Sequence, residues 1–213
     1  MKKSKALAVE IKKPERAVKK FSVASIGFGS MAGAICNNLR DSNITIRVGA
    51  RNAGSASIKK AVSEGFEIHS IKKAVKISDC VLLAIPDLQI RNFFDENAHE
   101  MFEGKCLVLC HGLSFFYHPL SFPKNCDIIL ISPNAIANKL RENYVHKKGD
   151  YALCAVLRDH SKKASKMLKL ICGALGIPAN KTIISRLKDE VFSDLFAEQS
   201  LLVGGILAII LSS

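Results

Sequence analysis

Two glycines separated by one residue, Gly27-Phe28-Gly29, stand directly between an apolar segment and an amphipathic one. The apolar segment, residues 21–26, has the composition of a buried strand, and residues 30–40 have their apolar positions at helical spacing. A strand that turns through glycines into a helix brings free backbone N–H groups and the positive end of the helix dipole to one point. The pattern therefore predicts a βαβ unit that binds the phosphates of a dinucleotide, although glycine turns also serve as plain connectors.

The positions of the turn have different expected roles. Gly27 permits the tight turn, Gly29 lets the backbone approach a pyrophosphate, and Ala32 lets the helix pack closely on the strand. The residues expected to contact the cofactor here are Gly27, Phe28, Gly29, Ser30 and Met31.

Short apolar runs alternate with amphipathic stretches along most of the chain, as is typical of βα units in a parallel sheet. The expected fold class is α/β, a Rossmann-type doubly wound parallel sheet followed by the start of a helical domain. The expected strands are residues 21–26, 44–48, 66–68, 79–85, 105–110, 127–132 and, as the last one, 151–157. The expected helices are residues 30–40, 57–64, 71–77, 88–101, 161–175 and 188–213.

A change of pattern near residue 183 suggests a domain boundary. We expect residues 21–183 to form the nucleotide-binding domain and residues 184–213 to form the first helix of a helical domain. Residues 1–20 are rich in Lys and lack the apolar stretch of about 7–15 residues that marks a signal peptide, so we expect a polar leader.

The apolar run at residues 201–211 is shorter than the roughly 20 residues that a membrane-spanning helix needs. A membrane anchor is therefore the minor alternative, and we expect a helix that is buried or that packs against a partner. Either a homo-oligomer or a partner helix would then cover residues 195–211.

The residues after the second expected strand indicate which dinucleotide fits. A binder of NAD carries Asp or Glu about 20 residues after the glycine turn for the ribose hydroxyls, and here no acid follows that strand before Glu64. Instead, Arg51, Ser55 and Ser57 offer a cation and two hydroxyls, a set suited to a 2′-phosphate. The sequence therefore predicts NADP(H). Ser55 or Ser57 also fits the role of helix N-cap, and the two roles are compatible.

The net charge of +12 raises the alternative of a nucleic-acid partner. Much of the excess lies in Lys-Lys pairs spread along the chain, a distribution typical of a solvated surface, and the chain has no Trp for stacking on bases. Nucleic acid is therefore the weakest of the partner hypotheses. The seven cysteines form no CxxC motif and lie partly in apolar runs, which favours a reducing, cytoplasmic setting.

A series of segments carries a family resemblance in one continuous order from about residue 20 to residue 206. They are residues 26–30, 39–42 and 48–57, Pro86-Asp87, Cys110-His111-Gly112-Leu113, Ser132-Pro133, residues 141–145, Asp194-Leu195-Phe196-Ala197-Glu198-Gln199 and Gly204-Gly205. The chain resembles ketol-acid reductoisomerase. The resemblance implies NADPH and Mg²⁺ as cofactors, and isomerisation and reduction of acetohydroxy acids in branched-chain amino-acid synthesis.

The resemblance also implies roles for individual residues. Arg51, Ser55 and Ser57 match the loop that holds the 2′-phosphate, and Pro86 and Asp87 match residues beside the cofactor. His111 matches a His near the active site, and Asp194 and Glu198 match two metal ligands, so these three are the candidate catalytic residues. Asp194 and Glu198 are four positions apart and share one face of a helix, so both carboxylates can reach one hard cation. Without the resemblance, such a pair is more often a solvated helix face.

The chain departs from the family at two points. Asn134 stands where the family has an active-site Lys, and Lys139, five positions further on, would need a rearranged loop to replace it. The chain ends at Ser213, within the first helix of the domain from which the family draws further carboxylate ligands. We therefore expect Mg²⁺ binding to be weak or lost.

Three functions remain open from the sequence. The first is a degenerate relative that keeps the NADPH site but not the isomeroreductase chemistry. The second is an active enzyme completed by another chain, and the third is a basic nucleic-acid-associated protein that reuses the fold. We favour the first.

Overall fold

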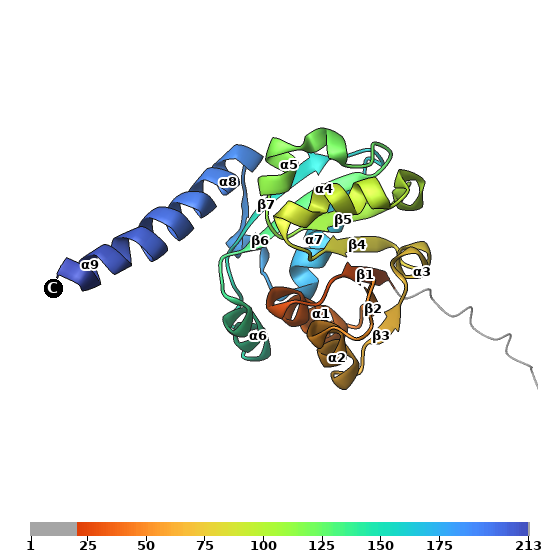
Figure 1. Ribbon diagram of the computed structural model, residues 1–213, viewed down its shortest axis with the longest axis horizontal. Helices are drawn as coiled ribbons and strands as arrows, with labels where there is room; N and C mark the ends of the chain where they lie inside the picture. The colour runs from red at the N-terminus through yellow and green to blue at the C-terminus, as the bar shows by residue number, and fades with distance from the viewer. Residues whose placement is uncertain (1–20, 213) are drawn as a thin grey trace, which may run out of the picture.

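The computed structural model describes residues 21–212, apart from the side chains of residues 198, 199 and 201–203. The predicted leader, residues 1–20, and the side chain of the predicted metal ligand Glu198 lie outside the described residues. The described part forms one eight-stranded sheet between two layers of helices (Figure 1). The predicted α/β, Rossmann-type fold class is confirmed.

The strand order is β3-β2-β1-β4-β5-β6-β7-β8. The strands are β1 (Ser22–Ile26), β2 (Thr45–Gly49), β3 (Glu67–His69), β4 (Cys80–Leu83), β5 (Cys106–Leu109), β6 (Asp127–Pro133), β7 (Ala152–Arg158) and β8 (Thr182–Ile184). The helices are α1 (Ser30–Asp41), α2 (Ala56–Ser63), α3 (Ile71–Lys76), α4 (Asp87–Glu96), α5 (Leu113–Tyr117), α6 (Ala137–Val145), α7 (Ala164–Ala174), α8 (Leu187–Leu195) and α9 (Ile206–Ser212), with a π-helical segment, η4 (Phe196–Gly205), between α8 and α9.

Strand β7 differs from the predicted parallel arrangement, because it pairs antiparallel with β6. Helix α6 packs against α1 rather than crossing the sheet as a βα connection, and its Arg141 is bound to Asp41 at the end of α1. The chain therefore returns to the sheet at the carboxyl end of β6, where Pro133 is paired with Ala152. From there β7 must run antiparallel to β6.

The expectation that residues 151–157 form the last strand was wrong. Strand β8 follows it and pairs parallel with β7 at the edge of the sheet. The proposed boundary at residue 183 lies inside β8, so we propose that the helical domain begins after Ile184.

Helix boundaries also differ from the prediction in places. The helix predicted over residues 88–101 ends at Glu96, and a separate 3₁₀ turn covers His99–Phe102. Helices α5 and α6 were not predicted. Helix α5 has only five residues, and α6 buries only Leu140, so neither has the repeated apolar positions that mark a helix in a sequence.

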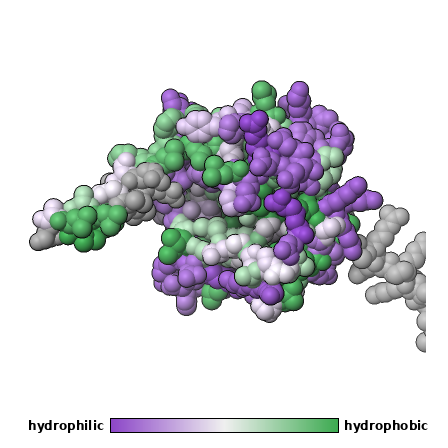
Figure 2. Space-filling model, in the orientation of Figure 1, coloured by the Kyte–Doolittle hydropathy of each residue, from purple (hydrophilic) through white to green (hydrophobic). Residues whose placement is uncertain are grey.

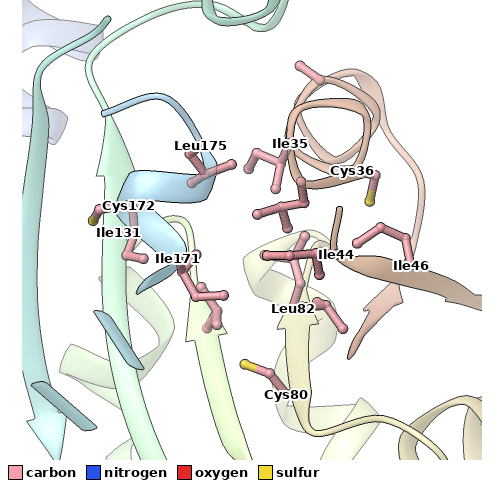
Figure 3. Packing of buried hydrophobic residues seen from close by; sticks show 14 of the residues in the cluster. Ile35, Cys36, Ile44, Ile46, Cys80, Leu82, Ile131, Ile171, Cys172 and Leu175 are labelled. Carbon is pink, nitrogen blue, oxygen red and sulfur yellow. The ribbon is translucent and has the colours of Figure 1, made fainter. Parts of the chain in front are cut away.

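Each face of the sheet has its own apolar core. One core lies between the sheet and helices α1, α2 and α7, and the other lies between the sheet and helices α3, α4 and α5. Figure 3 shows the first core, where Ile35 of α1 lies opposite Leu175 beyond α7, with Leu82 of β4 below them. Burial on both faces explains why the central strands are continuous apolar runs.

Helix α8 begins against the sheet, where its Glu190 and Val191 are buried, and η4 and α9 project away from the sheet (Figure 1). Figure 2 shows apolar surface at the projecting end of α9. Its exposed large apolar residues are Ile206, Leu207, Ile209, Ile210 and Leu211. Within residues 21–212, no helix has both the length and the apolar character needed to span a bilayer.

Leu82 of β4 lies in the first core and is only 2% exposed. Replacing Leu82 with Ala leaves a cavity in a packed core, so we expect a loss of about 2–5 kcal/mol in the free energy of unfolding. The matched control is Leu88→Ala, because Leu88 is 93% exposed, and we expect a change within about 0.5 kcal/mol. Urea unfolding measures both. Equal effects of the two substitutions would contradict the assigned core.

Candidate functional site

A cleft of about 1000 Å³ opens at the carboxyl ends of β1, β4, β5 and β6. The strand order reverses between β1 and β4, and in open α/β sheets ligands bind at this point. The cleft is lined by residues from the start of α1, the ends of three strands and the end of α8. The predicted site residues among them are Gly29, Ser30, Met31, Pro86, Asp87, His111 and Asp194.

The turn after β1 depends on the absence of a side chain at Gly27. Its φ is +95°, and a Cβ atom there would lie 2.5 Å from the carbonyl oxygen of Ala84. Because that oxygen belongs to the backbone after β4, it cannot move aside as a flexible side chain could. Gly27 thus allows β1 and β4 to remain adjacent while the chain turns into α1.

The N-terminus of α1 lines the cleft through Gly29, Ser30, Met31 and Ala32. Gly29 occupies the N-cap position, makes no side-chain cap bond, and has open space where its Cβ would be. The first N–H groups of a helix have no partner inside it, so they are available to an anion. The Phe28 ring is buried against Phe66, with ring centroids 5.2 Å apart, so the Phe28 side chain belongs to the core and does not line the cleft.

The predicted 2′-phosphate loop lies just outside the lining of the cleft. Arg51 follows β2 and its Nη1 lies 2.8 Å from Oε2 of Glu96, at the end of α4. Ser55 occupies the N-cap position of α2 but makes no side-chain cap bond. Its hydroxyl instead lies 3.3 Å from that of Ser57. Neither serine is therefore committed to a cap, and both hydroxyls lie side by side.

Asp87 links α4 to α5 at the floor of the cleft. Its Oδ1 accepts hydrogen bonds from the Ser114 backbone N–H at 3.2 Å and from the Ser114 hydroxyl at 2.5 Å. Its Oδ2 lies 3.7 Å from Nε2 of His111. The Asp87 carboxylate therefore links the start of α4 to the start of α5 and faces the imidazole of His111.

His111 is surrounded by carboxylates. Its Nδ1 lies 3.1 Å from Oδ2 of Asp194 and 3.5 Å from Oε1 of Glu190, while Asp87 faces the other nitrogen. The nearby carboxylate of Glu190 contributes most to raising the pKa of His111 above its ordinary value, against the effect of burial, and the charges of Asp87 and Asp194 add to the rise. The arrangement favours a protonated imidazole at the cleft.

Glu190 was not predicted as a site residue, although it is the most buried member of this group. Its side chain is 0% exposed, and its Oε2 accepts a hydrogen bond from the backbone N–H of Gly112 at 3.1 Å. Its Oε1 makes no hydrogen bond within the described part of the chain. A signal was present in the sequence, because Glu190, Asp194 and Glu198 repeat at intervals of four and so share one helix face.

His111, Glu190 and Asp194 each offer one atom that could bind a metal ion, and these three atoms lie within 4.8 Å of one another. The unbonded, buried Oε1 of Glu190 is one of the oxygens of this group, and carboxylate oxygens suit a hard cation such as Mg²⁺. An imidazole nitrogen suits transition metals better. The described residues therefore fit a divalent cation by type, but they supply few oxygens for Mg²⁺.

The segment where the family resemblance implies a lysine is neutral. Asn134 lines the cleft, and its backbone N–H donates to the carbonyl of Tyr151. Lys139 lies on α6, is half-exposed, and its Nζ is 3.0 Å from Glu142. Its amine is therefore engaged on the surface of α6 and does not line the cleft.

Comparison with known proteins agrees with this geometry. Residues 17–180 match the family described as acetohydroxy acid isomeroreductase, NADPH-binding domain. The chain is 35% identical to the ketol-acid reductoisomerase (NADP(+)) of Pyrococcus abyssi and 34% identical to that of Helicobacter acinonychis, over 89% and 91% of its own length. It spans only 57% and 59% of the length of these two relatives.

A solved structure of an NADH-preferring ketol-acid reductoisomerase from an uncultured archaeon has the same fold. The two chains superpose with a TM-score of 0.84 at 26% identity, over 90% of this chain and 60% of the other.

The two glycines of the turn are expected to respond differently to substitution. Gly27→Ala forces a Cβ against the Ala84 carbonyl at a positive φ, so we expect a loss of about 1–3 kcal/mol in the free energy of unfolding. Gly29 has a φ of −71° and open space at its Cβ, so Gly29→Ala should cost no more than about 1 kcal/mol. Thermal or urea unfolding of both variants is the measurement. A Gly29→Ala loss as large as that of Gly27→Ala would contradict the geometry of the turn.

Proposed function

The chain belongs to the acetohydroxy acid isomeroreductase (ketol-acid reductoisomerase) family, whose NADPH-binding domain it carries, and from this premise we propose that it binds NADPH while having lost most of the isomeroreductase chemistry. The observation that carries the binding proposal is the single cleft that runs from the N-terminus of α1 to His111. The proposal places the pyrophosphate on the first N–H groups of α1, next to Gly29, Ser30 and Met31.

The adenosine end of the cofactor is assigned to the loop after β2. There, Arg51 would pair with the 2′-phosphate, and the hydroxyls of Ser55 and Ser57 would donate hydrogen bonds to it. The two hydroxyls lie 3.3 Å apart, which supports a shared acceptor. The nicotinamide end is then assigned to the side of Pro86, Asp87 and His111. Bound NADPH supplies a hydride for reduction of a carbonyl group.

The protein groups at that end support proton handling. His111, with its raised pKa, would hold a proton at the cleft, and Asp194 and Glu190 would fix its ring from the Nδ1 side. We propose Asp194, Glu198 and Glu190 as the residues that would hold a divalent cation, which when bound supplies a Lewis acid. The substrate of such a site would be an acetohydroxy acid.

The proposed loss of chemistry rests first on Asn134, which lines the same cleft after β6. Asn134 offers a neutral amide where the resemblance implies an ammonium group. It therefore supplies no positive charge to stabilise a substrate oxygen that becomes negative during the reaction. Lys139 is held by Glu142. Among the described side chains, few oxygens are available to Mg²⁺, which adds to the deficit. Binding without efficient turnover follows from these three features together.

An active enzyme completed by another chain is the second candidate. The exposed apolar residues of α9 favour it, because exposed apolar surface of this kind marks contact with a partner. A homo-oligomer or a partner helix over residues 195–211 would cover this surface.

The described cysteines are all free thiols, which supports the proposed cytoplasmic setting.

We expect the chain to bind NADPH more tightly than NADH, because only NADPH carries the phosphate that Arg51 would pair with. Arg51→Ala should weaken NADPH binding about tenfold or more, since hydrogen bonds to charged groups are the strong ones, and leave NADH binding nearly unchanged. Fluorescence titration with each nucleotide measures this.

The matched control is Arg91→Ala, which removes an exposed arginine that is ion-paired with Asp95 on α4. It should not alter the ratio of the two affinities. Equal binding of NADPH and NADH by the unchanged chain, or binding of neither, would overturn the cofactor assignment.

The proposed loss of chemistry predicts that the chain alone does not turn over 2-acetolactate with NADPH and Mg²⁺. The physical reason is the neutral Asn134 and the sparse cation site. Oxidation of NADPH is followed by absorbance, with and without substrate. Turnover of the substrate by the chain alone would show that the chemistry is retained and would favour the second candidate.

A further inference from the structure

We propose that Glu96 reduces the preference of this chain for NADPH over NADH, because it holds Arg51 in an ion pair. The inference rests on the proposed NADPH site and deepens it. Glu96 is far from the glycine turn and from the loop after β2 in the sequence, and the fold alone brings it to the loop.

The contact on which the inference rests is a direct ion pair. Nη1 of Arg51 lies 2.8 Å from Oε2 of Glu96, and both side chains are 56% exposed. Glu96 is the last residue of α4, whereas Asp87, the first residue of the same helix, lines the cleft. Helix α4 therefore runs from the proposed nicotinamide end of the site to the loop assigned to the 2′-phosphate.

The pair affects the two nucleotides differently. To bind NADPH, Arg51 must release Glu96 or share its guanidinium between the Glu96 carboxylate and the 2′-phosphate, which weakens its hold on the phosphate. NADH has no 2′-phosphate, so its binding does not compete with the ion pair.

The test is the substitution Glu96→Gln, which keeps the shape of the side chain and removes its charge. Exposed ion pairs are weak, so NADPH should bind roughly two- to fivefold more tightly, with the affinity for NADH unchanged. The same contrast should appear with the fragments 2′,5′-ADP and 5′-AMP, which carry only the adenosine end. Isothermal titration calorimetry on the full chain measures all four ligands.

The matched control is Asp95→Asn. Asp95 is the adjacent residue of α4, is 64% exposed, and pairs with Arg91 rather than with Arg51. Its substitution removes the same charge from the same helix, and the ratio of NADPH to NADH affinity should not change. A double variant, Arg51→Ala with Glu96→Gln, should lose the gain, because Glu96 acts through Arg51.

An unchanged affinity ratio in Glu96→Gln, an equal shift in Asp95→Asn, or a gain that persists without Arg51 would overturn the role of Glu96 while leaving the NADPH site intact. Failure of the unchanged chain to bind either nucleotide would overturn the proposed function and this inference together.

Discussion

The close approach of the turn at Gly27 to the carbonyl of Ala84 is the constraint on which the cleft depends. Only glycine fits there, because a Cβ would lie 2.5 Å from a backbone oxygen at a φ of +95°. With that approach in place, α1 begins at the same edge of the sheet as the segment that carries Pro86 and Asp87 after β4. The anion-binding start of a helix and the acidic floor of the cleft are therefore placed by one turn.

The buried carboxylate of Glu190 connects this cleft to α8. A buried charge is costly unless it is paired and hydrogen-bonded, and Glu190 meets the backbone N–H of Gly112 and the ring of His111. Glycine at 112 leaves room for this contact, since a Cβ there would lie 2.6 Å from Oε2 of Glu190. The attachment of α8 to the sheet and the environment of His111 thus rest on the same side chain, whereas α9 extends from the sheet with its apolar residues exposed.

Local patterns predicted much of the fold and part of the site. The glycine turn, the buried strands and the neighbourhood of His111 and Asp194 follow from spacing, composition and family resemblance. The antiparallel direction of β7 did not follow, because it depends on where α6 docks against α1, a tertiary contact that includes the Arg141–Asp41 pair. Strand β8 has only three residues, too few for a pattern. The pairing of Arg51 with Glu96 joins residues 45 positions apart, and only tertiary structure brings them together.

The most direct test of the central claim, that the turn still binds NADPH, is a two-dimensional ¹H–¹⁵N NMR titration of the labelled chain with NADPH. The account predicts that the largest amide shifts occur at Gly29, Ser30 and Met31, at the start of α1, together with shifts at Arg51, Ser55 and Ser57. NADH should shift the first group but leave the second less affected. Shifts that avoid the start of α1, or no shifts at saturating NADPH, would contradict the account.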